Sequence, residues 1–227
     1  AVVPFEDTDE VDSPSSSNNR SKISIYSEVE QGENIRPAGQ DISKGDLIIA
    51  AGTELRPPHI GILASLGYDK VTVVRRPVVA ILATGDELLS PSDDHKAGKV
   101  YDSNSYGLAA AVQHSGGTPI ILGIAGDDLN AIEEKLQGGL GSDMLITSAG
   151  VSKGDYDIVK DVLSKHGKIH FWSIRMRPAK PLAFGVINGP DGQALPHLGL
   201  PGNPVSALVA FEQFGRPAMH KMLGKGQ

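Results

Sequence analysis

Apolar and polar residues form a clear pattern in the second half of the 227-residue chain and a weaker one in the first. Residues 78–83 form a near-continuous apolar run, typical of a strand buried on both faces of a parallel sheet. Further apolar runs predict strands at 119–124, 144–147, 169–174 and 182–187. Amphipathic segments with capping residues predict helices at 104–114, 129–136, 156–166 and 203–222. This alternation predicts an α/β fold with a doubly wound, mostly parallel sheet.

The residues before Pro77 show a weaker pattern. Short alternating or apolar stretches predict strands at 23–26, 47–50 and 71–74. A helix is expected to begin at Pro57 and to stop at Gly67. We therefore expect a smaller β-rich segment to precede the α/β domain. The expected divisions are a fragment of a β-rich domain at 1–34, part of an α+β linker domain at 35–76, the α/β domain at 77–224 and a tail at 225–227.

Composition removes several classes of function. The net charge of −6 disfavours general nucleic-acid binding, because a surface that tracks phosphates usually needs a basic excess. The chain has no cysteine, which excludes disulfides, thiolate catalysis and cysteine-ligated metals. No apolar run reaches the ~20 residues of a membrane span and no signal peptide is visible, so we expect no membrane partner and a cytoplasmic location. The chain opens on Ala1-Val2-Val3 without a methionine, which suggests a partial chain.

Small, acidic and basic residues follow the predicted strands, at the sheet edge where open α/β proteins bind ligands. Each group also has a structural explanation, since Asp127, Asp128 and Asn203 can cap helices and isolated cations are usually solvated. Their joint placement favours a site. The groups are residues 84–88, 126–128, 148–157, 175–180 and 199–204.

The chemistry of these groups points to a phosphate-bearing substrate. The small residues 148–154 allow backbone N–H groups to approach an anion. Arg177 and Lys180 can neutralise an oxyanion, with charge-assisted hydrogen bonds worth about 1.5–3 kcal/mol each. Magnesium is usually held by one or two carboxylates plus substrate phosphates. Its candidate ligands are Glu87, Asp102, Asp128 and Asp157. No nucleophile–base pair stands out, which favours group transfer by positioning and electrostatics.

Five motifs in this order resemble the MoeA-type molybdopterin molybdotransferases, including the E domain of gephyrin. They are 83–88 (ATGDEL), 101–104 (YDSN), 150–157 (GVSKGDYD), 177–181 (RPAKP) and 200–206 (LPGNPVS). The resemblance is dense from Pro77 to about Gly224, and residues 35–42 match the segment that precedes this domain in the family. Ala149 and Ala179 stand where the family usually has glycine, and Arg177 stands where it has lysine. The family's Asp-Gly-Tyr/Phe-Ala motif and its final β-domain are not found in this chain.

The resemblance implies a molybdopterin-binding fold and a transferase of molybdenum cofactor biosynthesis. Such proteins insert molybdate into adenylated molybdopterin and release AMP with magnesium present. It implies Mg²⁺ held by Glu87 and Asp157, with Asp102 and Asp128 as further catalytic acids. It also implies a homodimer and a molybdopterin adenylyltransferase as a partner. The implied substrate-binding residues are Thr84, Gly85, Asp86, Asn104, Ser148, Gly150, Ser152, Gly154, Arg177, Lys180, Pro201, Gly202, Asn203 and Ser206.

Three other functions share parts of this pattern. A MogA-like molybdopterin adenylyltransferase and a CinA-like pyrophosphatase have a related α/β domain. The segment before Pro77 and the 177–181 motif argue against both. A gephyrin-like scaffold is the third, although nothing in the sequence shows a receptor groove.

Overall fold

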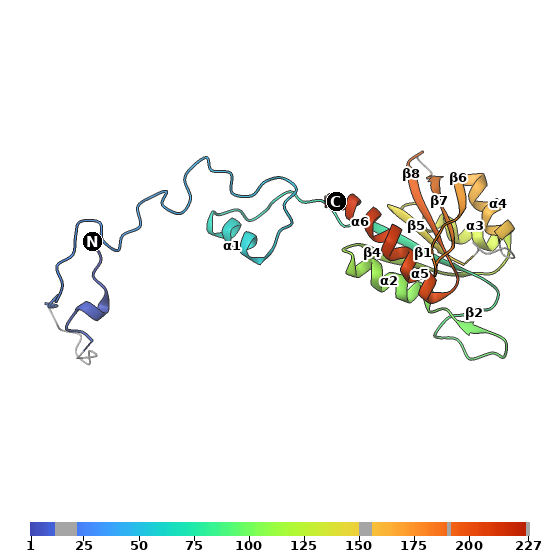
Figure 1. Cartoon of the computed structure of the whole chain (residues 1–227), viewed down its shortest axis with the longest axis horizontal. Coiled ribbons are helices and arrows are strands. Elements are labelled where there is room, and N and C mark those ends of the chain that lie inside the picture. The colour runs from blue at the N-terminus through green and yellow to red at the C-terminus, as the bar shows by residue number, and fades with distance from the viewer. Residues whose placement is uncertain (12–21, 150–155, 190–191, 226–227) are drawn as a thin grey trace. The chain divides into compact units, whose positions relative to one another are not determined.

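The computed structural model describes residues 1–11, 22–149, 156–189 and 192–225. Its contacts divide the chain into two units, Ala1–Thr53 and Glu54–Gln227 (Figure 1). The finer division at residues 34, 76 and 224 stays a prediction. Within the described residues, no helix is both long enough and apolar enough to cross a membrane.

The second unit is built on a six-stranded sheet with the strand order β4-β1-β5-β8-β7-β6. Strands β4, β1, β5 and β8 run parallel, whereas β7 is antiparallel to both of its neighbours. This confirms the expected α/β fold with a mostly parallel sheet. The strand bounds are β1 Val78–Thr84, β4 Thr118–Ala125, β5 Met144–Ser148, β6 Gly167–Ser173, β7 Pro181–Asn188 and β8 Ala194–Leu200.

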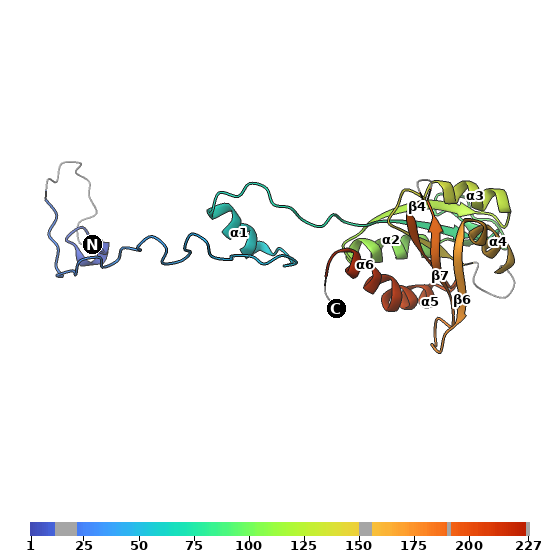
Figure 2. The ribbon, with the colours of Figure 1, turned by 90° about the horizontal axis from the view of Figure 1, so that it is seen from above.

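Helices cover both faces of the sheet (Figure 2). On one face, Ile132 of α3 and Leu163 of α4 pack with Leu145 of β5. On the other face, Leu108 of α2 and the fully buried Phe211 pack with Ile146 of the same strand. The helices are α2 Asn104–His114, α3 Leu129–Gln137, α4 Tyr156–His166, α5 Pro204–Ala210, the π-helical turn Phe211–Gly215 and α6 Arg216–Met222. Two apolar clusters therefore fix the strand ends that carry the polar motifs.

Three strands of this unit were not predicted. β8 contains Pro196 and Gly199, which interrupt the apolar pattern, yet it pairs with β5 and β7. The other two are β2 Leu88–Leu89 and β3 Val100–Tyr101, a parallel pair in the excursion between β1 and α2. Two-residue strands are too short to show a period. Across this pair, Val100 N–H donates to the Glu87 carbonyl at 2.9 Å and Asp102 N–H donates to that of Leu89 at 2.8 Å, so Glu87 and Asp102 flank opposite ends of the same short ladder.

The first 76 residues differ from the expectation. They contain a 3-10 turn at Phe5–Asp7, the helix α1 Pro57–Ser65 and a single bridge between Thr8 and Ile25. The strands predicted at 47–50 and 71–74 are wrong, and the one at 23–26 is reduced to that bridge. Leu47 is 82% exposed and Val73 63%, so neither stretch has a partner that satisfies its backbone or buries its side chains. The predicted helix and its stop at Gly67, which has φ 81°, are confirmed.

Candidate functional site

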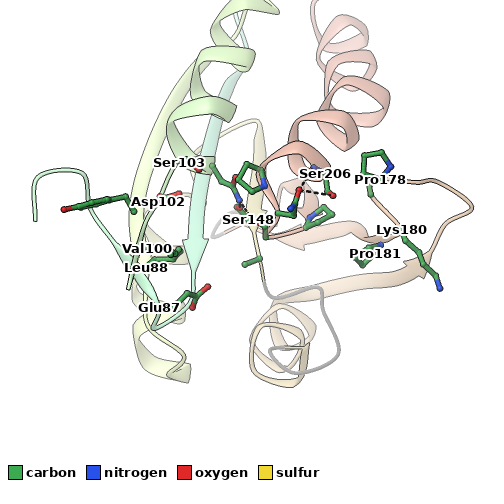
Figure 3. A pocket seen from close by; sticks show the side chains of 18 of the residues that line it. Glu87, Leu88, Val100, Asp102, Ser103, Ser148, Pro178, Lys180, Pro181 and Ser206 are labelled. Atoms are coloured by element: carbon green, nitrogen blue, oxygen red, sulfur yellow. Dashed lines mark hydrogen bonds between the residues drawn. The ribbon is translucent and has the colours of Figure 1, made fainter. Parts of the chain in front are cut away.

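A pocket of about 720 Å³ opens at the end of the sheet where the parallel strands finish (Figure 3). Its walls come from the excursion after β1, the start of α2, the end of β5, the loop between β6 and β7, and the loop between β8 and α5. It brings together ten of the residues predicted to form the site. They are Glu87, Asp102, Asn104, Ser148, Arg177, Lys180, Pro201, Gly202, Asn203 and Ser206.

Four predicted residues lie outside the lining, and each has a structural contact. The buried Thr84 hydroxyl faces the carbonyl of Ser148 at 3.5 Å. Asp86 accepts a hydrogen bond from Asp127 N–H at 3.0 Å, and Asp128 caps α3 by accepting one from Ala131 N–H at 3.0 Å. Gly85 donates its N–H to the Ala125 carbonyl at 3.1 Å. The remaining predicted residues, Gly150, Ser152, Gly154 and the side chain of Asp157, lie outside the part of the chain that the structure describes.

Gly85 determines where the carboxylate of Glu87 can lie. Gly85 has a φ of 138°, and a Cβ built there would meet Glu87 Oε2 at 2.3 Å. A side chain at Gly85 would therefore collide with the Glu87 carboxylate. The absence of a side chain at Gly85 therefore leaves room for the position that the Glu87 carboxylate occupies.

The acids that line the pocket differ in how much of their hydrogen-bonding capacity is used. Asp102 is 4% exposed and accepts a hydrogen bond from Ser105 N–H at 3.0 Å. No described hydrogen bond or ion pair uses the Glu87 carboxylate. Among the described residues, no three acids or histidines form a metal cluster. The arrangement fits an ion that takes one or two protein carboxylates and completes its shell from water and a phosphate, as magnesium does.

Two cations enter the pocket from the loop between β6 and β7. Arg177 and Lys180 line it, and neither forms an ion pair with any described residue. The loop is held by Ile174 N–H, which donates to the Lys180 carbonyl at 2.8 Å. Pro178 and Ala179 complete this wall. Unpaired cations in a concave site create a positive potential, which favours an anionic ligand.

Ala149 and Ala179 both adopt left-handed backbone conformations, with φ of 74° and 75°. This region favours glycine, because a Cβ there crowds the following carbonyl. Both alanines line the pocket, and Ala179 is 3% exposed. The family's usual glycines at these positions thus have a conformational explanation.

Asparagine side chains hold the loops of the pocket. Asn104 Nδ2 lies 2.7 Å from Ser148 Oγ and 2.7 Å from the carbonyl oxygen of Gly202. Asn203 Oδ1 accepts a hydrogen bond from Ser206 N–H at 3.1 Å, which caps α5 as predicted. The start of α2, the end of β5 and the loop after β8 are therefore tied together.

A buried histidine lies behind the pocket without entering it. His197 on β8 is 3% exposed, and its Nε2 lies 3.0 Å from the hydroxyl of Thr147, the residue before Ser148. Burial lowers the pKa of His197 to about 3, so the ring is neutral near pH 7. No described histidine lines the pocket.

The sequence motifs did not identify every residue of the lining. Pro178, Ala179, Pro181 and Pro204 lie inside motifs, so their position could have been inferred. Leu88 closes the first motif, and Tyr101 and Ser103 lie inside the 101–104 motif, whereas Val100 lies outside every motif and enters through the β2–β3 pairing. Ala149 completes the set.

Comparison with known proteins agrees with this geometry. Residues 80–221 match the family described as the probable molybdopterin binding domain. The chain belongs to the molybdopterin-binding domain family. Residues 1–67 match the N-terminal region of MoeA, domains I and II. These two matches confirm the resemblance carried by the motifs.

The relatives of this chain carry consistent names. A molybdopterin molybdenumtransferase from Nostoc sp. is 40% identical over 91% of this chain and 47% of its own length. Gephyrin from Dictyostelium discoideum is 34% identical over 100% of this chain and 34% of its own. The crystal structure of a molybdopterin biosynthesis MoeA protein from Pyrococcus horikosii superposes with a TM-score of 0.77 at 31% identity, covering 99% of this chain and 53% of that one. The chain spans about half the length of the molybdenumtransferases it matches.

Proposed function

We propose that this chain is the substrate-binding part of a molybdopterin molybdenumtransferase. It binds adenylated molybdopterin and molybdate, and AMP is released as molybdate is inserted. The observation that carries this proposal is the pocket itself, in which Arg177 and Lys180 have no described counter-ion and face the same cavity as Glu87. The names and partial coverage of the relatives support the reaction class.

In this proposal each group of side chains has one task. Arg177 and Lys180 hold the molybdate or phosphate oxygens and stabilise the negative charge that develops on the departing AMP. Glu87 and Asp157 would hold Mg²⁺, which supplies charge neutralisation at the phosphates when bound. Asp102 lines the pocket and accepts a hydrogen bond from Ser105 N–H, so we give it the task of positioning the start of α2. Asp128 lies outside the lining and caps α3, so we propose a structural role for it in place of the catalytic one that the resemblance implied.

The proposal includes an assembly and a supplier of substrate. We propose a cytoplasmic homodimer in which this chain accepts adenylated molybdopterin from a molybdopterin adenylyltransferase. The N-terminal unit supports association, because none of its described apolar side chains is buried. Sedimentation at a series of concentrations tests the dimer, and a single monomeric species at all concentrations would contradict it.

Product analysis tests the reaction. Purified protein is incubated with adenylated molybdopterin and Mg²⁺, with and without molybdate, and AMP is quantified. We expect release that depends on molybdate, and we expect Asp157→Asn to abolish it while Asp161→Asn, an exposed acid on the same helix, leaves it unchanged. Unchanged turnover in Asp157→Asn would remove the role given to that acid. Consumption of ATP with formation of the adenylate would instead indicate adenylyltransferase chemistry.

A further inference from the structure

Only one orientation of the Asn104 amide avoids facing the carbonyl oxygen of Gly202 with an acceptor, and it leaves the buried Oδ1 without a partner among the described residues. The atom assigned as Nδ2 lies 2.7 Å from the carbonyl oxygen of Gly202. A carbonyl oxygen can only accept a hydrogen bond, so the atom that faces it has to be the amide nitrogen. The flipped amide would place two acceptors 2.7 Å apart with no hydrogen between them.

This orientation fixes the direction of the hydrogen bond at Ser148. The same amide nitrogen lies 2.7 Å from Ser148 Oγ, so its two hydrogens go to Gly202 and to Ser148. Ser148 therefore accepts from Asn104, and its own hydroxyl hydrogen is left to donate elsewhere. Ser148 is 2% exposed, and no acceptor for this hydrogen occurs in the described parts of the chain. A buried donor without an acceptor is costly, which favours a ligand as its partner.

The surroundings of Ser148 indicate what that ligand presents. Ser148 lines the pocket together with Arg177 and Lys180, the two cations that have no described counter-ion. In Figure 3, Ser148 lies in the midst of the lining side chains, between Asp102 and Ser206. A hydroxyl donor in a pocket that two cations also line favours an anionic oxygen as its acceptor, because hydrogen bonds to charged groups are the strong ones.

We propose that Ser148 donates its hydroxyl hydrogen to an oxygen of a tetrahedral oxyanion bound in the pocket, and that Asn104 is the positioning residue that sets this polarity. The identity of the anion, a phosphate of the nucleotide or molybdate, rests on the proposed function. The direction of the hydrogen bond rests only on Gly202, Asn104 and Ser148. Asn104 thus acts on the ligand through Ser148, since both hydrogens of its amide are used within the protein.

Three variants and two controls test this arrangement by titration calorimetry, with molybdate and AMP as separate probes. Ser148→Ala removes the donor, and we expect about 10- to 100-fold weaker binding of the probe that the pocket takes. Ser148→Thr keeps the hydroxyl and is expected to bind better than Ser148→Ala. Asn104→Asp turns the donor into an acceptor that captures the Ser148 hydrogen and repels the anion, so it is expected to lose at least as much. Ser164→Ala and Asn130→Asp, both exposed and outside the pocket, are expected to match the unaltered chain.

The outcomes separate the proposal from its alternatives. Binding of both anions to Ser148→Ala at the strength of the unaltered chain would overturn it, as would a Ser148→Thr variant no better than Ser148→Ala. Failure of the unaltered chain to bind either anion would also overturn it. If thermal unfolding shows that Asn104→Asp does not fold, the comparison of Ser148→Ala with Ser148→Thr still tests the proposal. Anion binding that depends on Ser148, without molybdate-dependent AMP release, would remove the proposed function and leave this inference standing.

Discussion

The charged groups beyond β4 and those in the pocket occupy the same edge of the sheet, but the fold uses them differently. Beyond β4, Asp128 caps α3, and Asp86 and Asp127 accept from each other's backbone N–H groups at 3.0 and 3.4 Å. In the pocket, Glu87, Arg177 and Lys180 have no ion pair within the described chain. Position at a strand end therefore does not identify a ligand group by itself. The distinguishing property is whether the charge already has a partner.

The same contrast extends into the sheet. His197 Nε2 pairs with the Thr147 hydroxyl in the interior, while its Nδ1 is buried with no partner among the described residues, and His197 lies only a few residues before the pocket residue Pro201. The pocket cations Arg177 and Lys180 have no such partner within the described chain. Like charges gathered in a concave site repel each other, and a bound ligand of opposite charge offsets this repulsion. The predictions below compare groups that the fold uses with groups that it leaves for a ligand.

The largest effect is expected at His197, a group used by the fold. Its pKa is lowered to about 3 in the folded protein by burial, against 6.5 for the free side chain. Between these values the unfolded chain binds the extra proton, so stability present above pH 6.5 is lost as the pH falls. The loss is about 1.4 kcal/mol per pH unit, or about 2.7 kcal/mol by pH 4.5. In urea unfolding of His197→Leu, the free energy of unfolding is expected to fall less between pH 6.5 and pH 4.5 than in the unaltered chain, by this amount.

The exposed His114 supplies the control for that experiment, because His114→Leu should keep the acid limb of the unaltered chain. An equal slope in His197→Leu and the unaltered chain would show that His197 does not titrate in this way.

The second-largest effect on stability is expected at Gly85, which leaves space for the carboxylate of the pocket residue Glu87. Gly85→Ala is expected to cost about 1–2 kcal/mol of stability because of its positive φ, and also to displace the Glu87 carboxylate. Gly98 has a φ of 78° and no atom within 4 Å of the position that a Cβ would take, so Gly98→Ala carries a backbone cost alone. Only Gly85→Ala is expected to lose Mg²⁺-dependent AMP binding. Equal AMP binding by both variants would show that Gly85 does not affect AMP binding through the Glu87 carboxylate.

A smaller effect is expected at Asp128, the acid that caps α3. Asp128→Ala should lower the free energy of unfolding by about 1 kcal/mol, the usual value of an N-cap. Because the cap lies outside the pocket lining, AMP affinity should stay unchanged. Thermal unfolding and titration measure the two quantities, with the exposed Asp69→Ala as the control. A loss of AMP affinity without a loss of stability would show that Asp128 acts in the binding site and not as a helix cap.

The smallest effects are expected at the two left-handed alanines. Ala149→Gly should raise the free energy of unfolding by about 0.5–1 kcal/mol, since relief of the conformation exceeds the entropy cost of glycine. Ala179→Gly should be close to neutral, because it also removes a methyl group that is buried at 3% exposure, worth about 0.8 kcal/mol. Destabilisation of more than about 1 kcal/mol by Ala149→Gly would show that the backbone there is not strained.

The sequence predicted the strands that appear as mainly apolar runs, including β4 and β6 at the two edges of the sheet. Residues 78–83 have the pattern of a doubly buried strand, and Val79 to Ala83 are fully buried between β4 and β5. The stretch 47–50 has the same apolar character but pairs with nothing among the described residues, and strand propensity alone cannot supply a partner. β8 was missed for the opposite reason, because its pairing with β5 and β7 compensates for Pro196 and Gly199.

The candidate site was predicted wherever a motif ends a strand, as at Glu87, Ser148 and Lys180. It was not predicted at Val100, which lies outside every motif and reaches the pocket through a two-residue parallel pairing. Nor could the sequence separate Asp102, which enters the lining, from Asp128, which caps a helix. Both carry the same side chain beside a predicted helix, and only the tertiary contacts distinguish them.

The central claim is that the pocket takes its anion through charges that the fold leaves unpaired. It is tested most directly by titrating AMP and molybdate into the unaltered chain, Lys180→Glu and Asp128→Ala, with the exposed Lys70→Glu as the charge control. We predict binding by the unaltered chain, Asp128→Ala and Lys70→Glu, and a loss of about tenfold or more in Lys180→Glu. Equal losses of anion affinity in Lys180→Glu and Lys70→Glu would show that the effect comes from the net charge of the chain and not from the pocket. Unchanged binding in Lys180→Glu would contradict the claim.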